Sequence, residues 1–182
     1  MEAALDLASR RDWNAISLRD IAKKTKIPLS QLHEHFDDRL DIIAAWGRLL
    51  DKKVLESAGT PDPDTPVKDR LFDVLMDRFD ALNDNRDGAK SIIRALRRDP
   101  KQACIALPHL GRSMSWMLEA AGIETTGLKG ALKIAGVSAL YLRTLYVWCD
   151  DDSEDMAKTM AALDKNLGRA SEWAGSFLGK GK

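Results

Sequence analysis

The stretch SLRDIAKKTKIPLSQLHEHF, residues 17–36, decides the fold, because it predicts two short helices joined by a tight turn. Ser17 and Asp20 have the spacing of a capping box at the start of a helix. Pro28 stands where the second helix begins, a position that needs no backbone N–H. Leu32 and Phe36 are four residues apart and share one face of that helix. A short helix with one apolar edge and one polar edge predicts a helix-turn-helix, whose second helix enters the major groove of DNA.

Helical patterns continue on both sides of this stretch. Residues 2–11 predict a first helix, and Asp38 is a suitable N-cap for a fourth helix that runs to about residue 57. The segment GTPDPDTP, residues 59–66, contains three prolines and cannot continue a helix. We therefore expect an all-α chain with a DNA-binding domain at residues 1–50 and a helical bundle at residues 67–182 for ligand binding and dimerisation.

The motifs LRDIA (18–22), LHEHF (32–36) and DDRLDIIAAW (37–46) resemble those of the TetR family of bacterial one-component regulators. The resemblance implies an N-terminal three-helix helix-turn-helix domain and a helical bundle that forms a homodimer. It also implies repression at a near-palindromic operator in double-stranded DNA, released by a small effector. The chain departs from the family at the turn, where Lys26 replaces the usual glycine, and at Leu29, where a basic residue is common.

Candidate DNA contacts lie on the second helix of the motif and beside it. A glutamine amide matches adenine, so we expect Gln31 to contact a base edge, and Glu34 to accept from a cytosine amino group. Lys24, Lys26, Ser30, His33 and Arg39 would instead hold phosphates. Arg39 is included because the resemblance places a lysine at its position. A solvated surface side chain is the alternative for each of them. The full set is Lys24, Lys26, Ser30, Gln31, His33, Glu34 and Arg39.

The charge balance argues for modest DNA affinity. The chain carries 28 basic and 28 acidic residues, and residues 1–50 carry eight of each. Because cations supply most of the salt-dependent affinity for DNA, a neutral domain predicts weak non-specific binding.

The helix expected after residue 66 has apolar residues on two sides, as in the centre of a bundle. Its aromatic and methionine residues, with others near residue 116, predict a site for a mostly apolar effector. Core packing is the alternative for each residue. The expected lining is Phe72, Met76, Phe79, Trp116 and Met117.

Apolar residues in the last expected helix alternate steps of four and three, which is the pattern of a helical interface. The members of this pattern are Met156, Met160, Leu163, Leu167, Ala170, Ala174 and Phe177. In a dimer the last two helices of each copy would form a four-helix bundle, whereas in a monomer they would pair only with each other. The expected dimer contacts are Ala135, Ala139, Met160, Leu163 and Leu167.

The sequence shows no motif for catalysis, phosphate binding or metal binding, so we expect neither an enzyme nor a cofactor or metal requirement. Cys104 and Cys149 are isolated, as in a reducing cytoplasm. The longest apolar tract is too short to span or insert into a membrane.

A second function stays open. The segment ALYLRTLYVWCDDDSEDMAKTMAALDKNL, residues 139–167, also resembles the lipid-binding accessory proteins of ubiquinone biosynthesis, which share the TetR-like fold. Such a protein would bind an isoprenoid lipid without needing DNA.

Overall fold

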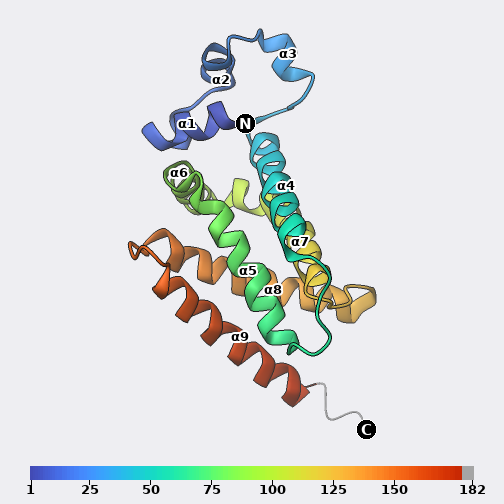
Figure 1. The fold of residues 1–182 in the computed structure, drawn as a ribbon. Coiled ribbons are helices and arrows are strands. Elements are labelled where there is room, and N and C mark those ends of the chain that lie inside the picture. Colours follow the sequence, from blue (N-terminus) through green and yellow to red (C-terminus); the bar gives the residue numbers. More distant parts are fainter. Residues whose placement is uncertain (178–182) are drawn as a thin grey trace. The chain divides into compact units, whose positions relative to one another are not determined.

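The computed structural model describes residues 1–177, with side chains through residue 171, and this part of the chain is helical without strands (Figure 1). The elements are α1 (Glu2–Arg10), η1 (Trp13–Ala15), α2 (Leu18–Thr25), α3 (Leu29–His33), α4 (Arg39–Ala58), α5 (Val67–Asn83), α6 (Arg86–Arg98), α7 (Pro100–Ala120), α8 (Gly127–Cys149) and α9 (Ala157–Phe177). The all-α expectation is confirmed.

The chain divides into two compact units. Unit 1 comprises Met1–Lys52 and Asp80–Leu110, and unit 2 comprises Lys53–Phe79 and Gly111–Lys182. The helix-turn-helix of α2 and α3 therefore belongs to the same compact unit as α6, although the two are far apart in sequence.

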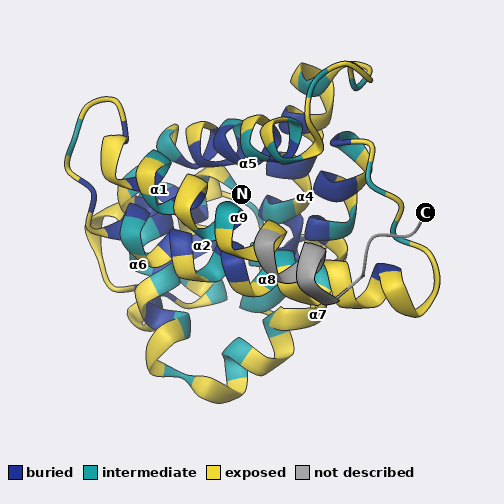
Figure 2. Cartoon of the chain, turned by 90° about the horizontal axis from the view of Figure 1, so that it is seen from below, coloured by how far each residue is buried: buried dark blue, intermediate teal, exposed yellow. Residues whose placement is uncertain are grey.

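Unit 1 is built on the close packing of α1 against α6, where buried and exposed residues alternate along both helices (Figure 2). Leu5 and Ala8 of α1 are buried, and Gly88 of α6 lies against the backbone of Leu5. The Trp13 N–H donates to Ser91 Oγ at 3.1 Å, and Ser91 Oγ donates to the Arg11 carbonyl at 3.1 Å. These contacts fix η1, and hence the start of α2, to α6.

Local signals at the helix starts are confirmed. Ser17 and Asp20 form a complete capping box on α2. The Asp38 carboxylate accepts from the Asp41 N–H at 2.9 Å, in the first turn of α4. Residues 59–66 connect α4 and α5, as the prolines predicted.

One expectation about helix length was wrong. The second helix of the motif was expected to include Phe36, but α3 ends at His33. Beyond it the N–H groups of His35 and Phe36 still donate to the Leu32 carbonyl, at 3.2 and 3.1 Å. Elsewhere, α7 begins at Pro100 and runs through Pro108 without a break. A proline within a helix removes one hydrogen bond and crowds the carbonyl four residues earlier, and α7 continues despite both effects.

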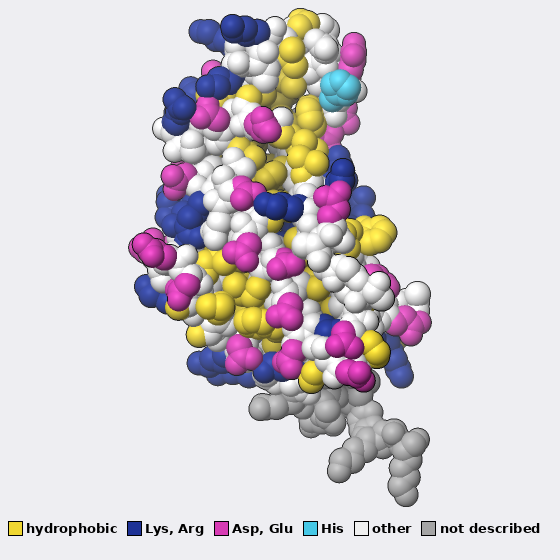
Figure 3. Space-filling model, viewed as in Figure 1, with side chains coloured by type: hydrophobic (Ala, Val, Ile, Leu, Met, Phe, Trp, Pro, Cys, Tyr) yellow, Lys and Arg dark blue, Asp and Glu magenta, His cyan; other side chains and the backbone are white. Residues whose placement is uncertain are grey.

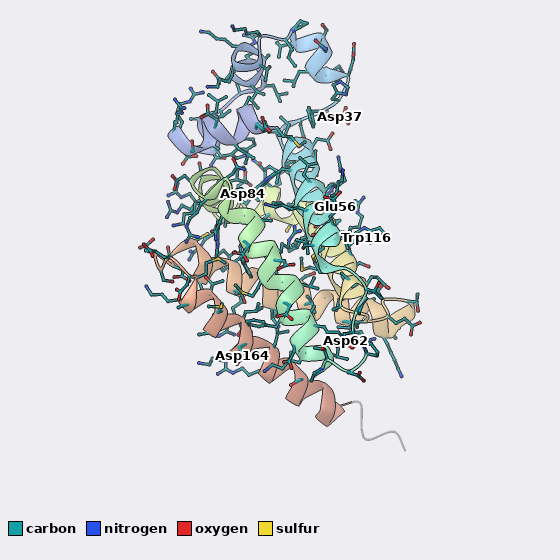
Figure 4. All side chains as sticks on the ribbon, in the orientation of Figure 1. Asp37, Glu56, Asp62, Asp84, Trp116 and Asp164 are labelled. Atoms are coloured by element: carbon teal, nitrogen blue, oxygen red, sulfur yellow. The ribbon has the colours of Figure 1, made fainter. Side chains whose placement is uncertain are left out.

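Unit 2 contains the antiparallel pair α8 and α9 (Figure 1). Leu163 and Trp148 are fully buried there, and the Phe79 ring stacks on Tyr141 with centroids 5.1 Å apart. Asp164, labelled in Figure 4, is an exposed residue of α9 whose carboxylate accepts from Lys68 Nζ of α5 at 2.6 Å. The apolar residues of both helices thus form a core within a single chain.

Candidate nucleic-acid interface

The turn between α2 and α3 sets the direction of the second helix. It depends on Lys26, which caps α2 in the left-handed region at φ 58°. The Lys26 N–H donates back to carbonyls of the last turn of α2. This is the position where the resemblance expects glycine, and a side chain there costs conformational energy.

Replacing Lys26 with glycine is expected to raise the free energy of unfolding by roughly 0.5–1 kcal/mol, because glycine adopts positive φ without strain. Urea unfolding followed by circular dichroism measures the change. Lys26→Ala removes the same charge but keeps a Cβ, so it is expected to give no such gain. Equal stabilisation by both variants would show that charge, and not backbone strain, is responsible.

The short helix α3 has the two edges that a DNA-reading helix needs. Leu32 is 5% exposed and anchors α3 in unit 1. The candidate base and phosphate contacts Ser30, Gln31, His33 and Glu34 are exposed. Lys26 is exposed in the preceding turn. The polar edge of α3 is therefore not covered by its own unit.

Several cations of unit 1 are held by acidic groups of the same unit. Lys24 Nζ lies 2.7 Å from Asp6, which also pairs with Arg10 at 2.8 Å. The hydrogen bond from Lys24, together with Arg10, holds the pKa of Asp6 below its ordinary value. Lys24, a predicted phosphate contact, is thus already engaged, as is Arg11, which lies 3.6 Å from Asp20.

The remaining cations near the motif are Arg19, Lys23 and Lys26, which are exposed and have no ion pair within the described residues. Figure 3 shows Lys and Arg side chains interspersed with Asp and Glu on the visible face. The charge available to phosphates is therefore smaller than the count of basic residues suggests.

Arg39 differs most from its predicted role. Its Nη1 donates to the carbonyls of Trp13 and Ile16, at 2.8 Å each. Its guanidinium also lies 5.7 Å from the centroid of the Trp13 ring. This half-buried side chain turns towards η1, and the phosphate contact expected of Arg39 stays a prediction.

The expected effector residues fall into three environments in unit 2. Phe79 and Met117 are fully buried, Met76 is buried and Phe72 is half-buried. Trp116 is 57% exposed on the outside of α7, and Figure 4 labels it there. The turns of α7 direct Met114, Met117 and Leu118 inward instead, and a role of Trp116 in an effector site stays a prediction.

The expected dimer residues also differ in how far they are buried. Ala135 and Ala139 are exposed on α8, and Met160 is half-buried. Leu163 and Leu167 instead pack inside unit 2, because the apolar face of α9 is used against its own chain. Ala174 and Phe177 lie beyond the side chains that the structure describes.

Sequence reasoning missed Ser91 and Asp6, which organise unit 1. Ser91 joins α6 to η1, and Asp6 holds Lys24 and Arg10. No local motif indicates either role, because both depend on which helices meet in the fold.

Two classes of site have no support in the described residues. Side chains through residue 171 include no group of three His, Cys, Asp or Glu placed to hold a metal ion. No helix among residues 1–177 is long and apolar enough to cross a membrane.

The chain has the TetR fold, because solved structures of TetR regulators are similar to it over most of its length. The similar structures are titled TetR transcriptional regulators. The one from Nitrosomonas europaea ATCC 19718 is 24% identical, covers 94% of this chain and 95% of its own, and has a TM-score of 0.73. One from Rhodococcus sp. RHA1 is 17% identical, covers 93% of this chain and 93% of its own, and has a TM-score of 0.58. One from Streptomyces coelicolor is 18% identical, covers 97% of this chain and 82% of its own, and has a TM-score of 0.61.

A family model gives a second similarity. The COQ9 family model matches residues 103–174, which is less than half of the chain and includes most of α7, all of α8 and most of α9. No curated protein sequence matches the chain. These likenesses establish the TetR fold and leave the function to be argued from the residues.

Proposed function

We propose that this chain is a DNA-binding transcriptional regulator, acting as a dimeric repressor that a mostly apolar effector releases. The observation that carries the proposal is the exposed polar edge of α3 beside its buried anchor Leu32. Gln31 would read adenine and Glu34 a cytosine amino group, while Lys26, Ser30 and His33 would hold phosphates.

Dimerisation is part of the proposal because α8 leaves an apolar stripe exposed. Leu128 is 80% and Leu132 66% exposed, and Ala135 and Ala139 continue the same side of the helix. Exposed apolar surface of this kind marks an interaction site. A two-fold pair would present two α3 helices to successive major grooves, about 34–36 Å apart, and would require a near-palindromic operator.

The effector would enter unit 2 near Phe72 and Met76, which border the core without being its most deeply buried members. An effector releases DNA only if it binds one conformation of the regulator more tightly than the other. The proposal therefore predicts that effector and operator weaken each other's binding equally.

Selection of bound duplexes from a random pool tests the proposal. The expected product is a near-palindromic consensus containing adenine. Gln31→Ala is expected to lower affinity for it by about thirtyfold or more, because each copy in the dimer loses a base contact worth about 1–3 kcal/mol. The control is Asn85→Ala, an exposed amide at the start of α6 whose side chain makes no cap hydrogen bond. If the wild-type dimer selects no sequence at low salt, where phosphate attraction is strongest, the proposal fails.

The second candidate is a lipid-binding accessory protein of ubiquinone biosynthesis. Two observations favour it: the COQ9 match includes residues 139–167, which carry that resemblance, and the internal ion pairs leave few cations for DNA. Mass spectrometry of lipids copurified with the native protein separates the candidates. A stoichiometric isoprenoid together with no selected duplex would support the accessory protein, whereas a selected duplex would support the regulator.

A further inference from the structure

Arg39 joins two elements of unit 1 that are distant in sequence. It is the first residue of α4, and its Nη1 approaches the carbonyls of Trp13 and Ile16 at 2.8 Å and that of Asn14 at 3.5 Å. Two of these distances are those of good hydrogen bonds from a charged donor, which are stronger than bonds between neutral groups. The first turn of α4 is therefore attached to η1.

The segment that Arg39 holds leads directly into the helix-turn-helix. Ile16 is the last residue before Ser17, which caps α2. On its other side the same segment is attached to α6 through Ser91. The entry point of α2 is thus fixed by α4 and α6 together, and the direction of α3 follows from α2 through the Lys26 turn.

We infer that Arg39 is a positioning residue for the DNA-binding surface and does not contact phosphate. It acts by holding η1, so that α2 and α3 present the polar edge of α3 in one orientation. The inference rests on the proposed regulator function. It assigns Arg39 a role opposite to the one that its surface position and charge suggested from the sequence.

Lysine cannot replace arginine in this role. A guanidinium is planar, donates in several fixed directions and stacks on an aromatic ring, whereas an ammonium is a compact point charge. The Trp13 ring, which is buried, lies under the guanidinium. Arg39→Lys therefore keeps the charge that a phosphate needs but loses the geometry that η1 needs.

The experiment compares Arg39→Lys, Arg39→Gln and the control Lys101→Gln, which removes an exposed cation of α7, outside the helix-turn-helix. Affinity for the selected duplex is titrated from about 50 to 200 mM salt at a temperature where circular dichroism shows each protein folded. Both Arg39 variants are expected to bind about tenfold more weakly, with the wild-type salt slope. Hydrogen exchange at residues 13–17 is expected to quicken in both.

A phosphate contact gives a different pattern. Arg39→Gln would then lower the salt slope by about 0.9 for each lost contact, while Arg39→Lys would stay close to wild type. That result overturns the inference, as does loss of stability with unchanged operator affinity in the folded variants. If the wild-type protein selects no duplex, the proposed function fails and the positioning role fails with it. If hydrogen exchange at residues 13–17 is unchanged in the Arg39 variants, the attachment of Arg39 to η1 is refuted, whatever the duplex selection shows.

Discussion

Replacing Asp151 with asparagine is expected to lower the free energy of unfolding by about 3 kcal/mol, since it disrupts several hydrogen bonds to a buried carboxylate. Asp151 is fully buried in the connection between α8 and α9. Its Oδ2 accepts from the N–H and hydroxyl of Thr159, at 2.8 and 2.7 Å. Its Oδ1 accepts from the N–H of Ser153 at 3.1 Å and from the Ser153 hydroxyl. An amide at this position turns a donor towards groups that are themselves donors.

Urea unfolding at neutral pH measures this loss. Asp150→Asn is the matched control, because Asp150 is the adjacent residue and is exposed, so its substitution is expected to stay within about 0.5 kcal/mol of wild type. Equal effects of the two substitutions would mean that general acidity near the start of α9, and not the bonds of Asp151, stabilises the pair.

The same carboxylate makes the stability of unit 2 depend on pH. Burial opposes the charged form of Asp151, but the bonds from Ser153 and Thr159 outweigh it and hold the pKa well below the ordinary value. A group with a depressed folded pKa contributes stability above its unfolded pKa, about 4, and loses it as the pH falls towards the folded value. Wild type is therefore expected to lose stability below about pH 4 more steeply than Asp151→Asn.

The sequence predicted well those features that depend on a few neighbouring residues. The capping box of Ser17 and Asp20, the Asp38 cap and the break at residues 59–66 all follow from local spacing and composition. The polar edge of α3 follows from the position of Leu32 in the helical repeat, since an anchored apolar edge leaves the other edge outward.

What the sequence missed depends on contacts between distant elements. Arg39 looked like a surface cation, and only the position of η1 shows that it turns inward. Asp151 stands in an acidic run, residues 150–155, and no local pattern indicates its bond from Thr159, eight residues further on. Trp116 resembled its apolar neighbours in the sequence, while the rotation of α7 places it outside.

Replacing Gly88 with alanine is expected to destabilise the chain by roughly 2 kcal/mol, even though alanine favours helix formation over glycine. A Cβ at Gly88 would lie 2.6 Å from the Leu5 carbonyl oxygen and 3.2 Å from its carbon. Backbone atoms cannot rotate away as a side chain can, so α1 has to separate from α6. Because α1 precedes η1 and α2, the loss of packing reaches the helix-turn-helix.

Gly47→Ala is the control that makes this prediction decisive. Gly47 also lies within a helix of unit 1, and a Cβ built there meets nothing within 4 Å. The gain in helix propensity then acts alone, and Gly47→Ala is expected to raise the free energy of unfolding by roughly 0.5–1 kcal/mol. The same chemical change should thus have opposite signs at two sites in urea unfolding. If Gly88→Ala is as stable as wild type, α1 is able to shift at no cost, and the close packing of α1 on α6 does not fix the orientation of α2 and α3.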